Sequence, residues 1–394
     1  MANTTQRKSL LVLGGGFAGV QAAIEAAKAG VFDVTLISDR HYIYLFPISI
    51  WIPTRTIAPG KTRVPLAKIA RSHRFDVRVG QVERIDAAAS TVTVDGEALS
   101  YDYAVLAIGA GKAKPKGHEH IVSICHGPEA ALTLRDQLDG LIAKGGGSIA
   151  VGFGGNPKDP SAVRGGPAFE MLFNIDHMLR RKKIRDKFSL TFFAPMDKPG
   201  NRMGTKAVAM MPSRFAKLGI ASQTGVKITE FDERGILFED GTRVEADVTM
   251  FIPAGVGNPI AAASGLPMNE AGFVRIDQHC LVEGTDNLYA VGDVAAIEGP
   301  DWRAKQGHLA EVMGRLAVKN LTNAVARKPE RESYVPHISI VCVMDTGNGA
   351  NYVVRNSKRE YAIPMPIVGN WLKRGWGWYA RVTKAYRVPR LPGM

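Results

Sequence analysis

The stretch "SLLVLGGGFAGVQAAIEAAKAGVFDVTLISDR" (residues 9–40) decides the fold of this chain. It begins with a short, continuous apolar run from Leu10 to Leu13, which is typical of a strand covered on both faces. A glycine-rich turn, an alanine-rich segment from Gly19 to Lys28 and a second apolar run, "DVTLIS", follow. This order predicts strand, turn, helix and strand, the first unit of an α/β domain with a parallel sheet.

The turn carries Gly14, Gly16 and Gly19 in the spacing of a dinucleotide-binding motif. The first glycine allows the tight turn, the second lets the backbone approach a pyrophosphate, and the third lets the helix pack on the strand. The helix N-terminus then offers free N–H groups and the positive end of its dipole to the phosphates. Asp39 ends the second strand, where an acid that binds ribose hydroxyls is expected.

Composition limits the remaining possibilities. With 394 residues, 45% hydrophobic and 22% charged, the chain exceeds one ordinary domain and can bury real cores. Three cysteines exclude a disulfide scaffold, and no apolar run reaches the ~18 residues that a spanning helix needs. The net charge of +13 favours anionic partners. No nucleic-acid-binding module accompanies that charge, so we expect no nucleic-acid partner.

Two later segments, "YDYAVLAIGA" (101–110) and "TDNLYAVGDVAAI" (285–297), resemble the paired signatures of flavoproteins with two dinucleotide-binding domains. The resemblance implies FAD as the cofactor, with Gly109 near it and Asp293 holding its ribityl chain or a phosphate. No metal site is predicted. The residues expected to contact FAD are Gly14, Gly16, Phe17, Ala18, Gly19, Asp39, Arg40, Pro47, Ala107, Gly109, Gly292, Asp293 and Lys305.

A second glycine unit, "IAVGFGGNPKDPSAVRGGPAFE" (149–170), lies where a second dinucleotide domain would begin. Its glycines are followed by an insertion with two prolines where a helix should start, which breaks the turn-to-helix geometry. The next strand, "LTFFAP", ends in Pro195 rather than an acid. These departures disfavour NAD(P)H as the electron donor.

The predicted architecture is α/β, with two Rossmann-like dinucleotide-binding domains and a C-terminal membrane-associating region. We expect an FAD-binding domain in two parts, residues 1–110 and residues 256–328. A second Rossmann-like domain is expected at residues 111–255, and the C-terminal region at residues 329–394.

Nearly the whole chain resembles the group of sulfide:quinone oxidoreductases, flavocytochrome c sulfide dehydrogenases and type II NADH dehydrogenases. The motifs are "VLGGGFAGV", "GPAFE", "MFIPAGVGNP", "AVGDVAAI", "AKQGHLAEVMG" and "SIVCVMDTG", and the sulfide:quinone branch is the most similar. The resemblance implies that Lys305 lies near the flavin pyrimidine edge. It also implies that Cys342 belongs to a two-cysteine redox site, with Cys125 as an accessory third cysteine.

The chain departs from that branch at the second redox cysteine. Val163 and Arg164 stand just before "GPAFE", where the partner cysteine is expected, and two family histidines fall at Glu129 and Asn201. Three readings of Cys342 therefore stay open. It could work with Cys125 in a sulfide oxidation cycle, act in a one-cysteine variant or with another donor, or be a packed residue.

The tail from Trp371 to Val388 predicts an amphipathic helix. One arc is apolar and aromatic, and the opposite side is basic. Such a helix can lie in a membrane surface, here the cytoplasmic face of the cell membrane. The alternative is that its aromatic face packs on the protein or in a dimer interface. The first arc holds Trp371, Leu372, Trp376, Trp378, Tyr379, Val382 and Tyr386, and the basic side holds Lys373, Arg374, Arg381, Lys384 and Arg387.

Two further segments complete the pattern. The loop "HYIYLFPISIWIP" (41–53) could wall a quinone site or be ordinary core, and "RRKKIRDK" (180–187) predicts a solvated helix end. The sequence thus predicts an FAD-dependent oxidoreductase, monotopic on the membrane, that passes electrons from a small inorganic sulfur donor to a quinone. A type II NADH dehydrogenase and a flavin-bearing scaffold without catalysis remain alternatives, and a homo-oligomer is left open.

Overall fold

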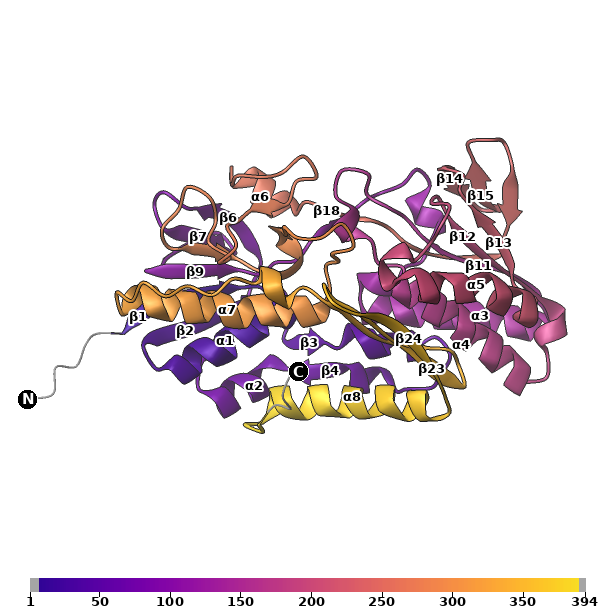
Figure 1. The fold of residues 1–394 in the computed structure, drawn as a ribbon, viewed down its shortest axis with the longest axis horizontal. Coiled ribbons are helices and arrows are strands. Elements are labelled where there is room, and N and C mark those ends of the chain that lie inside the picture. The colour runs from indigo at the N-terminus through magenta and orange to yellow at the C-terminus, as the bar shows by residue number, and fades with distance from the viewer. Residues whose placement is uncertain (1–6, 390–394) are drawn as a thin grey trace, which may run out of the picture.

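The computed structural model describes residues 7–389, and the first of its two parallel sheets is built around the opening motif. Five strands lie in the order β20-β9-β1-β2-β5 (Figure 1). Helix α1 starts four residues after β1 and packs against α7. The bounds are β1 Lys8–Leu13, α1 Phe17–Ala29, β2 Phe32–Ser38, β5 Asp76–Val79, β9 Tyr103–Leu106, β20 Leu288–Ala290 and α7 Gly307–Val325.

The second parallel sheet has the order β13-β12-β11-β17 and lies at the other end of the molecule in Figure 1. Its core is aromatic, since the rings of Phe169 and Phe192 stack at 4.8 Å and Phe215 lies 5.2 Å from Phe192. The bounds are α3 Pro128–Lys144, β11 Gly147–Phe153, α4 Gly166–Arg181, β12 Phe188–Ala194, α5 Thr205–Leu218, β13 Ala221–Thr224 and β17 Val248–Ile252.

The two sheets confirm the predicted α/β class with two dinucleotide-binding units. The disturbed second glycine unit is also confirmed, because α4 begins only at Gly166, well after β11 ends at Phe153. The short strands β10 (Gly111–Lys112) and β18 (Gly255–Val256) pair antiparallel, at the two points where the chain passes between the sheets. Two small antiparallel sheets have the strand orders β6-β7-β8 and β14-β15-β16.

Smaller elements fill the edges of both units. The bounds are β3 Tyr42–Tyr44, the 3-10 turn Phe46–Trp51, β4 Arg63–Pro65, α2 Leu66–His73, β6 Val82–Asp86, β7 Thr91–Val94, β8 Glu97–Ser100, β14 Ile228–Asp232, β15 Gly235–Phe238, β16 Arg243–Glu245, α6 Pro259–Ala263, β19 Val274–Arg275 and β21 Ala295–Ala296.

The C-terminal region is an antiparallel sheet, β22 (Ile340–Asp345), β23 (Gly349–Arg355) and β24 (Glu360–Pro366), followed by α8 (Val368–Ala385). Helix α8 runs along the lower side of the molecule in Figure 1 and contacts α2, β4 and all three strands of this sheet. Among residues 7–389, no helix is both long and apolar enough to span a bilayer.

The predicted basic side of α8 is wrong for two of its lysines. Lys373 is 5% exposed and Lys384 is 1% exposed, because each forms an ion pair with a buried acid, Glu170 and Glu311 respectively. The side of α8 that faces the protein therefore combines these lysines with small residues such as Gly377. Several apolar side chains point outward instead, led by Trp371, Leu372 and Trp378.

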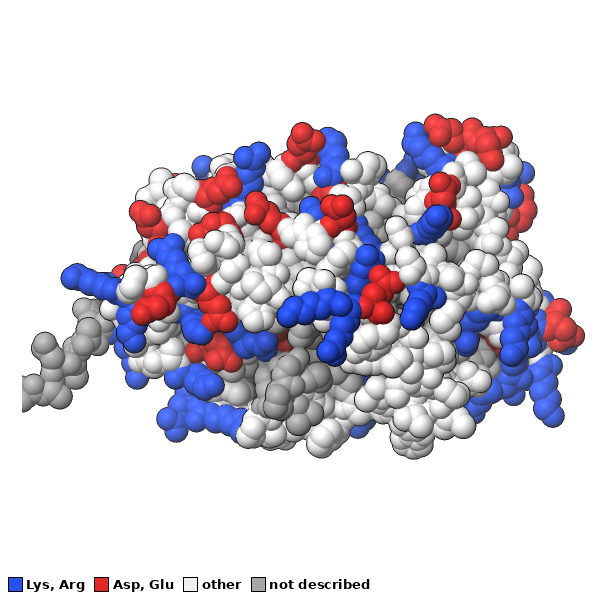
Figure 2. Space-filling view, viewed as in Figure 1, with Lys and Arg blue, Asp and Glu red and all other residues white. Residues whose placement is uncertain are grey.

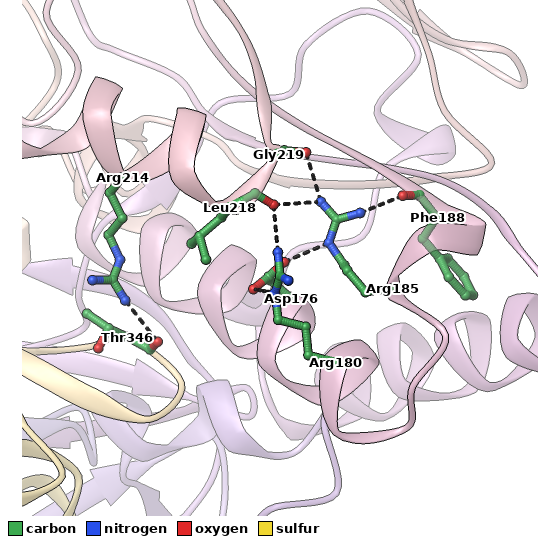
Figure 3. A network of polar contacts seen from close by, with 8 residues as sticks. All are labelled: Asp176, Arg180, Arg185, Phe188, Arg214, Leu218, Gly219 and Thr346. Carbon is green, nitrogen blue, oxygen red and sulfur yellow. Dashed lines mark hydrogen bonds and ion pairs between the residues drawn. The ribbon is translucent and has the colours of Figure 1, made fainter.

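The basic run 180–187 is only partly the solvated helix end that the sequence predicts. Figure 3 shows Arg180 and Arg185 both turned toward Asp176 and toward the carbonyl oxygen of Leu218, which ends α5. Arg185 also donates to the carbonyl oxygens of Phe188 and Gly219. These arginines neutralise a buried carboxylate and cap a helix C-terminus, whereas the residues 181–183 between them are exposed.

Candidate functional site

A single cavity of about 2790 Å³ collects most of the predicted site residues. Twelve of the thirteen residues predicted to contact FAD line it, as do Cys342 and several residues of α8. Gly19 is not among the lining residues, since it faces the turn beneath them. Cys125 is not among them either. The cavity therefore joins the first glycine turn, the second unit and the C-terminal region.

The glycine turn fits a pyrophosphate. Gly14 has a φ of +118°, and a Cβ there would collide with the carbonyl oxygen of Ala107. A Cβ on Gly19 would collide with the carbonyl oxygen of Gly14, so this residue must be glycine for α1 to pack closely. Gly16, in contrast, has open space within 4 Å of its Cβ position, and no side chain caps the N-terminus of α1. The uncapped N–H groups thus face a space that an anionic group can occupy.

Asp39 directly follows β2 and lines the same cavity, as expected for a ribose ligand. Its carboxylate is bound by Arg40, with Nε to Oδ1 at 3.0 Å and Nη2 to Oδ2 at 2.9 Å. The hydrogen bond to Asp39 raises the pKa of Arg40. The acid is therefore held in a fixed orientation, half-exposed toward the cavity.

Lys305 is a buried amine beside the predicted flavin position. Its Nζ donates to the carbonyl oxygen of Ala295 and lies 4.0 Å from the ring centroid of Phe273. Burial lowers the pKa of Lys305 to about 7, an effect that the carboxylate of Asp159 opposes. Near neutral pH this side chain can therefore both hold and release a proton.

Asp293, the predicted flavin ligand, forms an ion pair with Arg164. Sequence reasoning noted Arg164 only as the residue that stands in place of a cysteine. The signal for a larger role was an arginine directly before a helix N-terminus in a glycine-rich loop, at a place where anions bind. The guanidinium lies 5.8 Å from the ring centroid of Phe46, which also lines the cavity.

Cys342 lies on β22 as a free, half-buried thiol that lines the cavity. Burial, together with the negative charge of Glu170, raises its pKa to about 12, and the positive charge of Lys373 opposes the rise. Cys342 is thus a neutral thiol in this state, because a thiolate there would need an additional cation or a change of surroundings.

Cys125 has different neighbours from Cys342. It lies in a 3-10 turn (Ile124–His126) that precedes α3, and it is also a free thiol. Burial raises its pKa, whereas the nearby cations Arg164 and Lys112 lower it. The charged groups that shift the two pKa values differ, and no disulfide joins the two thiols in the described chain. Cooperation between Cys125 and Cys342 therefore stays a prediction.

A buried polar network lies beside Cys342, and the sequence analysis missed it. Glu170 pairs with Lys373 and accepts the backbone N–H of Asp345 at 2.8 Å. Asp345 in turn accepts from the indole N–H of Trp51 at 2.9 Å and from the amide of Asn174 at 3.1 Å. The sequence feature that indicates this network is Glu170, a lone glutamate on the apolar face of a predicted helix. A carboxylate buried at such a place requires a buried cation beside it.

The loop 41–53 serves as both core and cavity wall. Trp51, Ile48 and Ile50 are buried, whereas Tyr44 and Phe46 line the cavity. The sequence left both roles open. In the structure, some residues of the loop are core and others line the cavity.

Comparison with known proteins identifies the class. The family model of pyridine nucleotide-disulphide oxidoreductases matches residues 8–326, and the chain belongs to this family. A sulfide-quinone reductase of Aquifex aeolicus (strain VF5) is 27% identical over 370 residues, covering 88% of this chain and 83% of that protein. A type II NADH:quinone oxidoreductase of Mycobacterium tuberculosis is 28% identical over 327 residues, with coverages of 76% and 69%.

Solved structures agree with this assignment. The sulfide:quinone oxidoreductase of Aquifex aeolicus superposes with a TM-score of 0.86 at 25% identity, covering 97% of this chain and 93% of that chain. NDH2 of Plasmodium falciparum shares the fold, with a TM-score of 0.77 at 12% identity and 96% coverage of both chains. The predicted resemblance to this group is confirmed, and FAD is the cofactor of the chain.

Proposed function

We propose that the chain passes electrons from a reduced inorganic sulfur compound, through its FAD, to a quinone. One observation carries the proposal: Cys342, a free thiol, lines the same cavity as Gly14 and Asp293 of the flavin motifs. Aromatic residues of α8, among them Trp371 and Trp376, line that cavity as well. Apolar and aromatic walls suit the ring of a quinone.

Two relatives support a quinone as the acceptor, because one is a sulfide-quinone reductase and the other a type II NADH:quinone oxidoreductase. They differ in the donor that their names give. The insertion between β11 and α4 disturbs the turn at which a second dinucleotide would bind. The presence of Cys342 and this disturbed turn together favour a sulfur donor over NAD(P)H.

The proposed reaction needs a sulfur site and a route for protons. A hydrosulfide ion that becomes zero-valent sulfur releases two electrons and one proton, and a quinone takes up two electrons and two protons. Bound FAD supplies the two-electron chemistry between them. Cys342 would bind the sulfur at its Sγ. Lys305 can hold or release a proton at its Nζ near neutral pH, because its pKa is about 7.

Anaerobic mixing of the FAD-loaded protein with sodium sulfide should bleach the visible flavin absorbance, and a quinone analogue added afterwards should restore it. NADH at the same concentration should bleach it at least about 100-fold more slowly, because the second turn is disturbed. Stopped-flow absorbance measures both rates. Faster bleaching by NADH would identify a type II NADH dehydrogenase instead, and no bleaching by either donor would favour a non-catalytic flavin scaffold.

We also propose that α8 lies against the cytoplasmic face of the cell membrane. Trp371 and Trp378 are 70% and 66% exposed, and Ile367 and Val368 at the start of α8 are 70% and 60% exposed. Figure 2 shows a largely uncharged surface on the lower side of the molecule, beside the grey atoms and near the end of α8 that adjoins β24 in Figure 1. An apolar surface between basic ends suits an anionic lipid surface.

The double variant Trp371→Glu/Trp378→Glu should bind vesicles that contain anionic phospholipid about 100-fold more weakly than the unaltered protein. The change removes two apolar contacts and adds two charges of the same sign as the lipid. Vesicle co-sedimentation measures the partition. Val79→Glu, a substitution at another exposed apolar residue, is the control. Unchanged vesicle binding, with a dimer that dissociates in the double variant, would assign this surface to self-association.

A further inference from the structure

The cavity carries more positive charge than its own carboxylates balance. Eleven lysines and arginines line it, against six aspartates and glutamates and the two negatively charged phosphates that FAD brings. The two buried lysines of α8 and Arg40 are each paired with an acid. The amine of Lys112, in contrast, forms no hydrogen bond or ion pair with another residue of the range 7–389, although burial lowers its pKa to about 8. A half-buried cation without a partner needs a ligand or solvent to balance it.

Lys112 and Arg164 come from separate elements and share one neighbourhood. Lys112 ends β10, and Arg164 lies in the loop before α4. The positive charge of Arg164 helps burial to lower the pKa of Lys112, and both cations act on the thiol of Cys125. The three side chains therefore lie within electrostatic reach of one another at the cavity wall.

The guanidinium of Arg164 has N–H donors that bind no other residue of the described chain. One of its Nη atoms contacts the carboxylate of Asp293, and its Cζ lies over the ring of Phe46. A guanidinium carries five N–H donors, and within the described chain Arg164 makes no other polar side-chain contact. The unused donors lie at the cavity wall, together with the free amine of Lys112.

We propose that Arg164 and Lys112 form a binding site for a small sulfur anion, either a sulfide or a sulfur oxyanion such as thiosulfate. The inference rests on the proposed function and names the class of its donor. Only Gly165 separates Arg164 from "GPAFE", and the sulfide:quinone branch is expected to have a cysteine just before this motif. A guanidinium cannot form a persulfide, but it binds an anion through two parallel hydrogen bonds, and the ammonium group adds a second charge. The chain thus holds its donor by charge at this position.

Calorimetric titration of the FAD-loaded protein with sodium thiosulfate tests the site without turnover. Arg164→Gln and Lys112→Gln should each weaken thiosulfate binding by about 10-fold or more, because each removes a charge-assisted contact. Arg164→Lys should retain part of the affinity, since the charge remains and the fork geometry is lost. Arg181→Gln, at the exposed end of α4, is the matched control and should bind as the unaltered protein does. Flavin content and circular dichroism check the fold of each variant.

Two results would overturn the proposal. The first is that thiosulfate binds equally well to all variants, or to none of the proteins. The second is that Arg164→Gln weakens the binding of NADH and leaves the binding of thiosulfate unchanged, which would assign Arg164 to a nucleotide phosphate. Failure of the proposed function is distinguishable from these results. If thiosulfate binding depends on both cations while sulfide fails to bleach the flavin, the anion site stands and the sulfur-oxidising function does not. If sulfide bleaches the flavin equally fast in Arg164→Gln and binding is unchanged, the function stands and the site does not.

Discussion

Lys373→Met is expected to lower the free energy of unfolding of the FAD-loaded protein by about 3–5 kcal/mol at neutral pH. Lys373 is the cation that neutralises Glu170, and both side chains are about 95% removed from solvent. A methionine would leave the carboxylate of Glu170 buried and without a cation. That carboxylate would keep only its hydrogen bond from the backbone N–H of Asp345. Urea denaturation at a fixed FAD concentration, followed by circular dichroism, measures the change.

Two further variants separate this effect from a general weakening of α8. Arg374→Met changes the neighbouring exposed residue and should cost less than about 1 kcal/mol. Glu170→Gln combined with Lys373→Met removes both charges and should recover most of the loss. A free energy for Lys373→Met within about 1 kcal/mol of the unaltered protein would mean that Glu170 is protonated, and that the pair is not ionic.

The loss of unfolding free energy caused by Lys373→Met should depend on pH, and the direction of that dependence follows from the pKa of Glu170. Burial raises the pKa of Glu170 above its ordinary value, and removal of Lys373 takes away the largest opposing influence. The folded variant then binds more protons than the unfolded chain once the pH exceeds the unfolded pKa of about 4.3. Stability of the variant therefore falls as pH rises from about 4 to 7, and the difference from the unaltered protein is smallest at the acidic end.

The first unit could be predicted in detail because its constraints are local. Gly14 and Gly19 are fixed by backbone contacts within one turn, and the strand on each side is a continuous apolar run. The second unit could be predicted for the same reason, since the prolines of the inserted loop delay the start of α4 to Gly166. Patterns of this kind are complete within about 20 residues, so the sequence alone contains them.

The orientation of α8 could not be predicted, because it depends on partners far away in the chain. A helical wheel assigns Lys373 and Lys384 to a polar side, and polar sides normally face water. Here Glu170 and Glu311 lie 203 and 73 residues away, and the two ion pairs bring the lysines inside. A small-residue row between them, with Gly377 and Ala380, is the one local sign that this side packs on the protein. The ion pair of Arg164 with Asp293 is equally non-local.

Cys342→Ser is expected to lower the rate of sulfide-dependent quinone reduction by about 100-fold or more, with FAD content and the visible spectrum unchanged. The reason is that a serine hydroxyl is a weak nucleophile that cannot carry sulfur, whereas the thiol lines the cavity of the flavin motifs. Burial holds the pKa of Cys342 at about 12, so alkylation of this thiol by iodoacetamide should rise about tenfold per pH unit between about pH 7 and 10. Mass spectrometry of the modified peptide measures that rate without turnover.

Cys125→Ser is the comparator, because Cys125 is also a free thiol but is not among the residues that line the cavity. We expect it to lower the sulfide-dependent rate by less than about 10-fold, through loss of a neighbour of Arg164 and Lys112 rather than loss of a sulfur carrier. Equal, large losses in both variants would instead indicate that the two thiols work together. A Cys342→Ser protein that keeps its rate within about threefold would make Cys342 a packed residue of β22, and the sulfur would then have to be held by the anion site alone.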